Sequence, residues 1–188
     1  MKIVKSDVLD IKMDFYLNYY ENNNWIIENC EKVGEHYRLL YYIGNLYNNI
    51  QIIDAGTSNG YSCIPLSQNV NNIILSYDIY DKSYLKINHN IILKTMDINV
   101  ETNDIIKNSK IIFLDIDPHE GTQEIKFYEK LVNIGYDGIL ICDDINLNDN
   151  MKIFWNNIKE EKYDISDIGH YSGTGIVNFS NEKIEICR

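Results

Sequence analysis

The chain has 188 residues, of which 45% are hydrophobic, and a formal net charge of -11. This length suffices for one packed core and is too short for two ordinary domains, so we expect a single domain over 1–188. The acidic balance repels a phosphate backbone and the Lys and Arg residues are dispersed, which excludes a nucleic-acid partner from our expectations.

Membrane association and a cysteine-based framework are also not expected. No stretch approaches the roughly 20 apolar residues that cross a bilayer, and the first residues lack the apolar block of a signal peptide. We therefore expect a soluble, cytoplasmic protein without a membrane partner. The cysteines, Cys30, Cys63, Cys142 and Cys187, form no C-x-x-C pair, and neither a disulfide framework nor a zinc site is expected from them.

The first quarter of the chain has the periodicity of helices. Between Asp14 and Asn48, apolar residues recur mostly at three- and four-residue steps. This spacing predicts two or three amphipathic helices, within an N-terminal region 1–49 that precedes a core over 50–188.

The core alternates short β-branched runs with helical stretches. The runs lie at 51–56, 72–79, 91–98, 110–117 and 138–145, and each ends in or beside an acidic residue. Such alternation is typical of β-α-β units around a mostly parallel sheet, with helices on both faces. The tail, at 162–170 and 173–180, reads as two strands joined by a hairpin-like turn, and predicts an antiparallel pair at the end of the sheet.

A glycine loop follows the first of these runs, in the pattern Asp54-x-Gly56-x-x-x-Gly60. Its glycines allow a tight turn and close approach of a ligand to the backbone. A dinucleotide site would have G-x-G-x-x-G, whereas here Asp54 stands at the first glycine's place, so a nicotinamide-dependent oxidoreductase is not favoured. The plain alternative is a strand-to-helix turn without a ligand.

The loop resembles the first motif of class I methyltransferases, which bind S-adenosylmethionine. The resemblance implies a Rossmann-like fold and cofactor contacts from the loop and from later strand ends. Asp78, near the offset at which an acidic side chain meets ribose hydroxyls, is expected to bind the ribose, and Asp97 the adenine amino group. The residues expected to bind the cofactor are Asp54, Gly56, Ser58, Gly60, Tyr61, Ser62, Asp78 and Asp97.

Carboxylates follow the fourth and fifth runs, at Asp115, Asp117, Asp143 and Asp144. Adjacent parallel strands bring their carboxyl ends to one edge of a sheet, where open α/β sheets bind ligands. Clustered carboxylates repel one another, and a hard divalent cation, Mg²⁺ or Mn²⁺, would resolve that conflict. The plain reading of the Asp143–Asp144 pair is a strand-to-loop exit.

The runs DIDPHEGTQE and CDDI resemble the paired motifs of the macrocin-type, metal-dependent sugar O-methyltransferases. The resemblance implies that Asp115, Asp143 and Asp144 are metal ligands and that Asp117 is the general base. Catechol-type enzymes share the metal logic but have Asn at the position of Asp144. His119 is a weaker candidate for acceptor contact, against a loop histidine facing water; His36, His89 and His170 receive no role.

These resemblances imply methyl transfer from S-adenosylmethionine to a hydroxyl of a sugar, nucleotide-sugar or glycan. Two alternatives stay open: a metal-independent small-molecule methyltransferase, and a non-catalytic domain that binds S-adenosylmethionine. The lid segments of fuller family members have no counterpart here, so the acceptor site is expected either to be open or to be completed by the second subunit of a homodimer.

Overall fold

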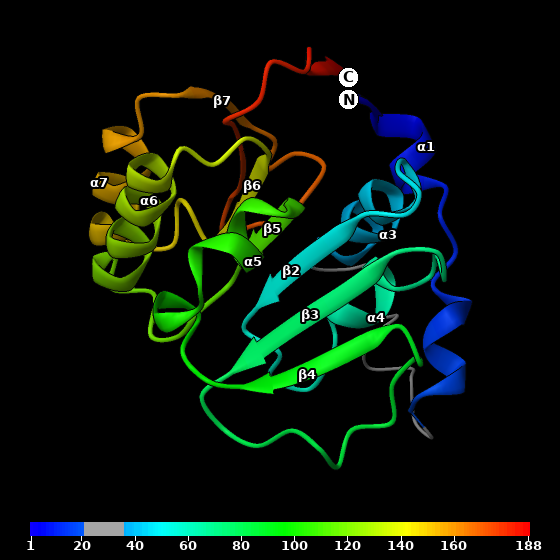
Figure 1. The fold of residues 1–188 in the computed structure, drawn as a ribbon. Coiled ribbons are helices and arrows are strands. Elements are labelled where there is room, and N and C mark those ends of the chain that lie inside the picture. Colours follow the sequence, from blue (N-terminus) through cyan, green and yellow to red (C-terminus); the bar gives the residue numbers. More distant parts are fainter. Residues whose placement is uncertain (21–35) are drawn as a thin grey trace.

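A seven-stranded sheet forms the centre of the computed structural model, which describes residues 1–20 and 36–188 (Figure 1). Its strand order is β4-β3-β2-β5-β6-β8-β7. The strands are β2 (Gln51–Ala55), β3 (Ile73–Asp78), β4 (Ile91–Thr95), β5 (Ser109–Leu114), β6 (Ile139–Asp143), β7 (Glu161–Asp164) and β8 (Thr174–Asn178). Strands β2, β3, β4, β5 and β6 all run parallel to one another. Strand β8 is antiparallel to both of its neighbours, β6 and β7. The predicted mostly parallel sheet with an antiparallel C-terminal pair is confirmed.

Helices cover both faces of this sheet, as predicted. They are α1 (Lys5–Leu9), α3 (Tyr37–Asn45), α4 (Cys63–Leu66), α5 (Asn103–Lys107), α6 (Thr122–Ile134) and α7 (Asp149–Asn157), with 3-10 turns η1 (Asp14–Asn18) and η2 (Ile98–Val100). Figure 1 shows α5, α6 and α7 on one side of the sheet and α1, α3 and α4 on the other. Of the predicted N-terminal helices, α3 is present, residues 14–18 form only the 3-10 turn η1, and 21–35 lie outside the described residues. Within the described ranges, no helix is both long and apolar enough to cross a membrane.

The sheet is buried on both faces because successive side chains of a strand point in opposite directions. In β2, Ile52 packs into the cluster that contains α3 and α4, and Ile53 into the cluster that contains α6 and α7. Both side chains are fully buried. This two-sided burial is why the strands read as continuous apolar runs rather than as alternating ones.

The antiparallel pair is shorter than the sequence predicts. Strand β7 ends at Asp164, whose Oδ1 accepts hydrogen bonds from the backbone amide and the hydroxyl of Ser166. Such an Asx turn gives the backbone an alternative to the sheet ladder, so it ends the strand. The 165–173 segment is therefore a loop, and it arches over the end of β6 before β8 begins at Thr174.

A second, two-stranded parallel sheet joins the two ends of the chain, and the sequence analysis does not anticipate it. Strand β1 (Lys2–Val4) pairs with β9 (Glu185–Cys187), and Ile3, at the centre of β1, is fully buried. Figure 1 shows the N- and C-termini side by side.

Candidate active site

The glycine loop is tied to the neighbouring strand by its backbone. The amides of Gly56 and Thr57 both donate to the carbonyl of Tyr77 at 2.9 Å. Gly56 has a φ of 110°, and a Cβ at this position would lie 1.7 Å from the carbonyl oxygen of Asp115. No side chain fits there, so the glycine is required by the close approach of this loop to the end of β5.

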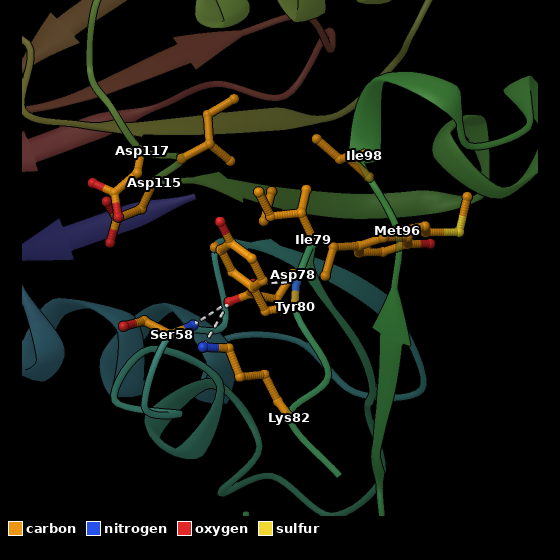
Figure 2. A pocket seen from close by; sticks show the side chains of 13 residues that line it. Ser58, Asp78, Ile79, Tyr80, Lys82, Met96, Ile98, Asp115 and Asp117 are labelled. Atoms are coloured by element: carbon orange, nitrogen blue, oxygen red, sulfur yellow. Dashed lines mark hydrogen bonds and ion pairs between the residues drawn. The ribbon is translucent and has the colours of Figure 1, made fainter.

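A pocket of about 500 Å³ lies beside this loop, at the carboxyl ends of the parallel strands. It extends from Gly56 and Ser58 past Asp78 to Asp115 and Asp117. Figure 2 shows the side chains of Ser58, Asp78, Asp115 and Asp117 in this wall. Its apolar wall consists of Ala55, Tyr77, Ile79, Tyr80, Met96, Ile98 and Ile116. A pocket of this size with an apolar wall and a few polar groups is typical of a small-molecule or cofactor site.

Asp78 is the best-supported polar group of the pocket wall. Its Oδ2 accepts a hydrogen bond from the backbone amide of Ser58 at 2.9 Å and lies 3.4 Å from Nζ of Lys82 (Figure 2). Its Oδ1 accepts from the amide of Tyr80 at 2.9 Å. These donors fix the carboxylate in place while lone pairs remain for further donors, such as ligand hydroxyls.

Among the described residues, the other predicted cofactor residues lie outside the pocket wall: Asp54, Gly60, Tyr61, Ser62 and Asp97. Asp97 caps η2 by accepting from the amide of Asn99 at 2.8 Å, and the side chains on either side of it, Met96 and Ile98, form the wall instead. The backbone carbonyl of Tyr61 accepts a hydrogen bond from the hydroxyl of Tyr16, and its ring packs against Tyr20.

Asp54 is fully buried within the sheet rather than exposed in the loop. The alternation of β2 places it on the same face as Ile52, and its Oδ2 accepts from the hydroxyl of Ser76 at 2.6 Å. Burial raises the pKa of Asp54 to about 6, although hydrogen bonds from Ser76 and Ser62 oppose this rise. Asp54 therefore connects β2 to β3 and does not line the pocket.

At the far end of the pocket, three of the predicted carboxylates surround His119. Its Nε2 lies 3.6 Å from Asp115 Oδ1 and 3.5 Å from both Asp117 Oδ1 and Asp144 Oδ2. His119 is thus not a loop histidine facing water, since only 15% of its side chain is exposed. Burial, followed by repulsion from Asp143 and Asp144, raises the pKa of Asp115 well above its ordinary value. The side chain of Asp117 is 95% exposed.

Asp143 lies against two other histidines. Its Oδ1 is 3.3 Å from Nδ1 of His36, at the start of α3, and 3.3 Å from Nδ1 of His170. Burial alone would raise the pKa of Asp143, but the two histidines outweigh it and hold the pKa well below its ordinary value. Ser172 fixes this arrangement, because its hydroxyl contacts His170 Nδ1 at 2.8 Å and donates to Asp144.

The structure thus brings the predicted metal ligands to one edge but divides them between different histidines. Asp115 and Asp144 lie beside His119, whereas Asp143 lies beside His36 and His170, which the sequence analysis left without a role. The signal for His170 was present in the tail. Because β8 pairs antiparallel with β6, in the register Asp143↔Thr174, the turn before β8 must lie over the end of β6. No sequence motif surrounds His36, and it lies at the site only because α3 packs against the sheet.

No family model and no curated protein matches the sequence, whereas solved structures share the fold. An O-methyltransferase from Bacillus cereus in complex with S-adenosylhomocysteine has 16% identity and a TM-score of 0.57, covering 92% of this chain and 94% of that one. An S-adenosylhomocysteine-bound methyltransferase from Podospora anserina has 12% identity and a TM-score of 0.59, covering 77% and 78%. The O-methyltransferase of tomaymycin synthesis from Streptomyces achromogenes, bound to S-adenosylmethionine, has 12% identity and a TM-score of 0.53, covering 76% and 78%. At these identities the likeness shows a Rossmann-like methyltransferase fold.

Proposed function

We propose that the chain is an S-adenosylmethionine-dependent O-methyltransferase that acts on a hydroxyl of a small acceptor. The observation that carries this proposal is the extent of the pocket: it runs without interruption from the glycine loop at Gly56, past Asp78, to the carboxylates at Asp115 and Asp117. The residues expected to bind the cofactor and the carboxylates expected to act on the acceptor therefore line the same pocket. The fold alone would not support an activity, since one fold hosts many functions.

The residues of the pocket fit S-adenosylmethionine, which supplies a methyl group on a positively charged sulfonium. Asp78 accepts hydrogen bonds from the ribose hydroxyls, and the apolar side chains of Ile79, Met96 and Ile98 pack against the adenine. Ile79 is 64% exposed, as expected for a large apolar side chain whose partner is a ligand. The other residues expected to bind the cofactor do not line this pocket and receive no direct contact with the cofactor in this proposal: Asp54, Gly60, Tyr61, Ser62 and Asp97.

The acidic edge fits a divalent cation by its charge. Asp115, Asp143 and Asp144 lie at the ends of adjacent strands, and their mutual repulsion is the conflict that Mg²⁺ or Mn²⁺ relieves. Such a cation would supply Lewis acidity toward an acceptor hydroxyl. Asp117, exposed at the pocket wall, accepts the hydroxyl proton, and His119 at 3.5 Å can share it. The acceptor is a sugar, nucleotide-sugar or glycan end with neighbouring hydroxyls.

A metal-independent methyltransferase is the second candidate, and the position of His119 favours it. The imidazole Nε2 lies within 3.6 Å of three carboxylates, so these carboxylates can orient the ring without a metal. In that case Nε2 of neutral His119 accepts the proton from the acceptor hydroxyl, and the three carboxylates stabilise the imidazolium that forms. Chelation of divalent metals separates the two candidates, because only the first loses turnover.

The first test is a calorimetric titration of the purified protein with S-adenosylhomocysteine, with and without Mg²⁺. Micromolar binding is expected and would justify assaying methyl transfer to a panel of nucleotide sugars and diols, with and without a chelator. Absence of binding in both conditions would refute the proposal. Binding without transfer to any hydroxylated compound would favour a non-catalytic cofactor-binding domain.

A further inference from the structure

His36 and His170 form a compact group with Asp143, and neither histidine belongs to the proposed all-carboxylate metal set, with which the group shares only Asp143. One ligand atom from each of the three lies within 4.8 Å of the others. Asp143 Oδ1 is 3.3 Å from Nδ1 of each histidine. The three side chains come from the N-cap of α3, the end of β6 and the turn before β8, which are distant in the sequence.

His36 is the member of the group that most needs a ligand. Only 2% of the residue is exposed, and within residues 1–20 and 36–188 its Nε2 has no hydrogen-bond partner, while its Nδ1 lies 3.3 Å from Asp143 Oδ1. A buried polar atom without a partner is costly, and native proteins rarely leave one in that state. Its Nδ1 points toward Asp143, and its ring packs against Phe113 and His170, which hold this orientation.

The separations match those between the ligands of one metal ion. With metal–ligand distances of about 2.0–2.1 Å, neighbouring ligands of a tetrahedral ion lie about 3.3 Å apart. Both separations from Asp143 to the histidines already have this value. A ligand atom of each histidine lies within 4.8 Å of the other, and Ser172 contacts the His170 ring at 2.8 Å.

We propose that His36, Asp143 and His170 bind a divalent transition-metal ion of the zinc type in preference to Mg²⁺. Two imidazole nitrogens and one carboxylate are typical ligands of such ions, whereas Mg²⁺ prefers oxygen ligands and retains its waters. Three protein ligands leave a coordination position open on the side of Asp144, whose Oδ1 lies 3.4 Å from His170 Nδ1. The inference rests on the proposed function only for the part that the ion would play in methyl transfer, because binding of the ion itself needs neither cofactor nor acceptor.

The test is titration of the chelator-stripped protein with Co²⁺, a zinc substitute whose visible absorption reports nitrogen ligands, and then with Mg²⁺. We expect one Co²⁺ per chain, bound about 100-fold more tightly than Mg²⁺. His170→Ala should weaken Co²⁺ binding at least 30-fold. The matched control His89→Ala, which removes an exposed histidine elsewhere, should leave it unchanged.

A second variant separates this site from the all-carboxylate set. Asp115→Asn should weaken Co²⁺ binding less than tenfold, because Asp115 is not a member of the group. Circular dichroism and titration with S-adenosylhomocysteine verify that each variant is folded. Equal affinities for Co²⁺ and Mg²⁺, unchanged binding in His170→Ala, or a larger loss in Asp115→Asn would each overturn the inference. Failure of the wild-type protein to bind S-adenosylhomocysteine would count against the proposed function alone.

Discussion

The two ends of the pocket differ in how their polar groups are satisfied. At the glycine loop, backbone amides donate the hydrogen bonds. The amides of Gly56 and Thr57 donate to the carbonyl of Tyr77, and Asp78 accepts from the amides of Ser58 and Tyr80. At the acidic edge, side chains face one another, with Asp115 and Asp144 around His119. Backbone hydrogen bonds fix the geometry of the loop before a ligand binds. Neighbouring carboxylates, in contrast, repel one another until a cation or a proton reduces their charge.

This contrast is tested most strongly at Asp143. If the acidic edge serves chemistry and the loop serves the cofactor, Asp143→Ala should lower methyl transfer about 1000-fold, or about 4 kcal/mol. The dissociation constant of S-adenosylhomocysteine should change less than threefold. Asp137→Ala is the matched control, since Asp137 is exposed just before the other end of β6. Equal loss of binding and turnover would make Asp143 a structural residue.

The preformed loop is tested by Gly56→Ala. The added Cβ would collide with the carbonyl of Asp115 at 1.7 Å, in a backbone region that side chains rarely adopt, so we expect a loss of about 4 kcal/mol of unfolding free energy. Gly135→Ala is the control, because Gly135 has a φ of 65° with no atom within 4 Å, and only the backbone penalty of about 1–2 kcal/mol applies. Urea denaturation measures both; equal losses would show that the loop relaxes.

Asp54 lies near the glycine loop but is buried in the sheet, and its contribution to the free energy of unfolding depends on pH. Burial raises its pKa from 3.8 to about 6, so the folded state holds a proton that the unfolded state releases. Stability is therefore greatest below pH 3.8 for this group and falls as pH rises through 6, by at most ~3 kcal/mol. Asp54→Asn should remove that dependence. Urea midpoints of wild type and variant at pH 4 and pH 7 should diverge; parallel values would contradict the prediction.

The smallest effect is expected for Asp78→Asn. The amide keeps one acceptor oxygen but loses the charge that attracts ribose hydroxyls, so affinity for S-adenosylhomocysteine should fall about tenfold, near 1.4 kcal/mol. Turnover at saturating S-adenosylmethionine should stay within twofold. Asp81→Asn, three residues along and outside the pocket wall, is the calorimetric control. A stronger effect on turnover than on affinity would place Asp78 in the chemistry.

The sheet could be predicted from the sequence because two-sided burial leaves a continuous apolar run in each parallel strand. The runs overshoot the strands at their carboxyl ends, since the run at 110–117 includes Asp115 and Asp117 while β5 ends at Leu114. Pocket position followed from the same pattern. Side-chain direction did not: strand alternation turns Asp54 into the core, although its place in the motif suggests a loop contact.

The histidines were missed for a different reason. His36 and His170 meet Asp143 only after α3 packs on the sheet and β8 pairs with β6, and no local spacing records those events. Charge patterns identify an acidic edge, but they do not show which neighbour each carboxylate faces. The two-stranded sheet was hidden likewise, because three-residue strands such as β1 and β9 leave no periodicity to detect.

The pairing of β1 with β9 has a consequence for the order of folding. Lys2 pairs with Glu185, so this contact closes a loop of nearly the whole chain, and the entropy of loop closure must be met before the contact forms. Strand β1 is synthesised before β9 and has no pairing partner until β9 has been made. Ile3, fully buried in the native fold, therefore cannot reach its native environment before then, and docking of β1 is expected to be a late step of folding.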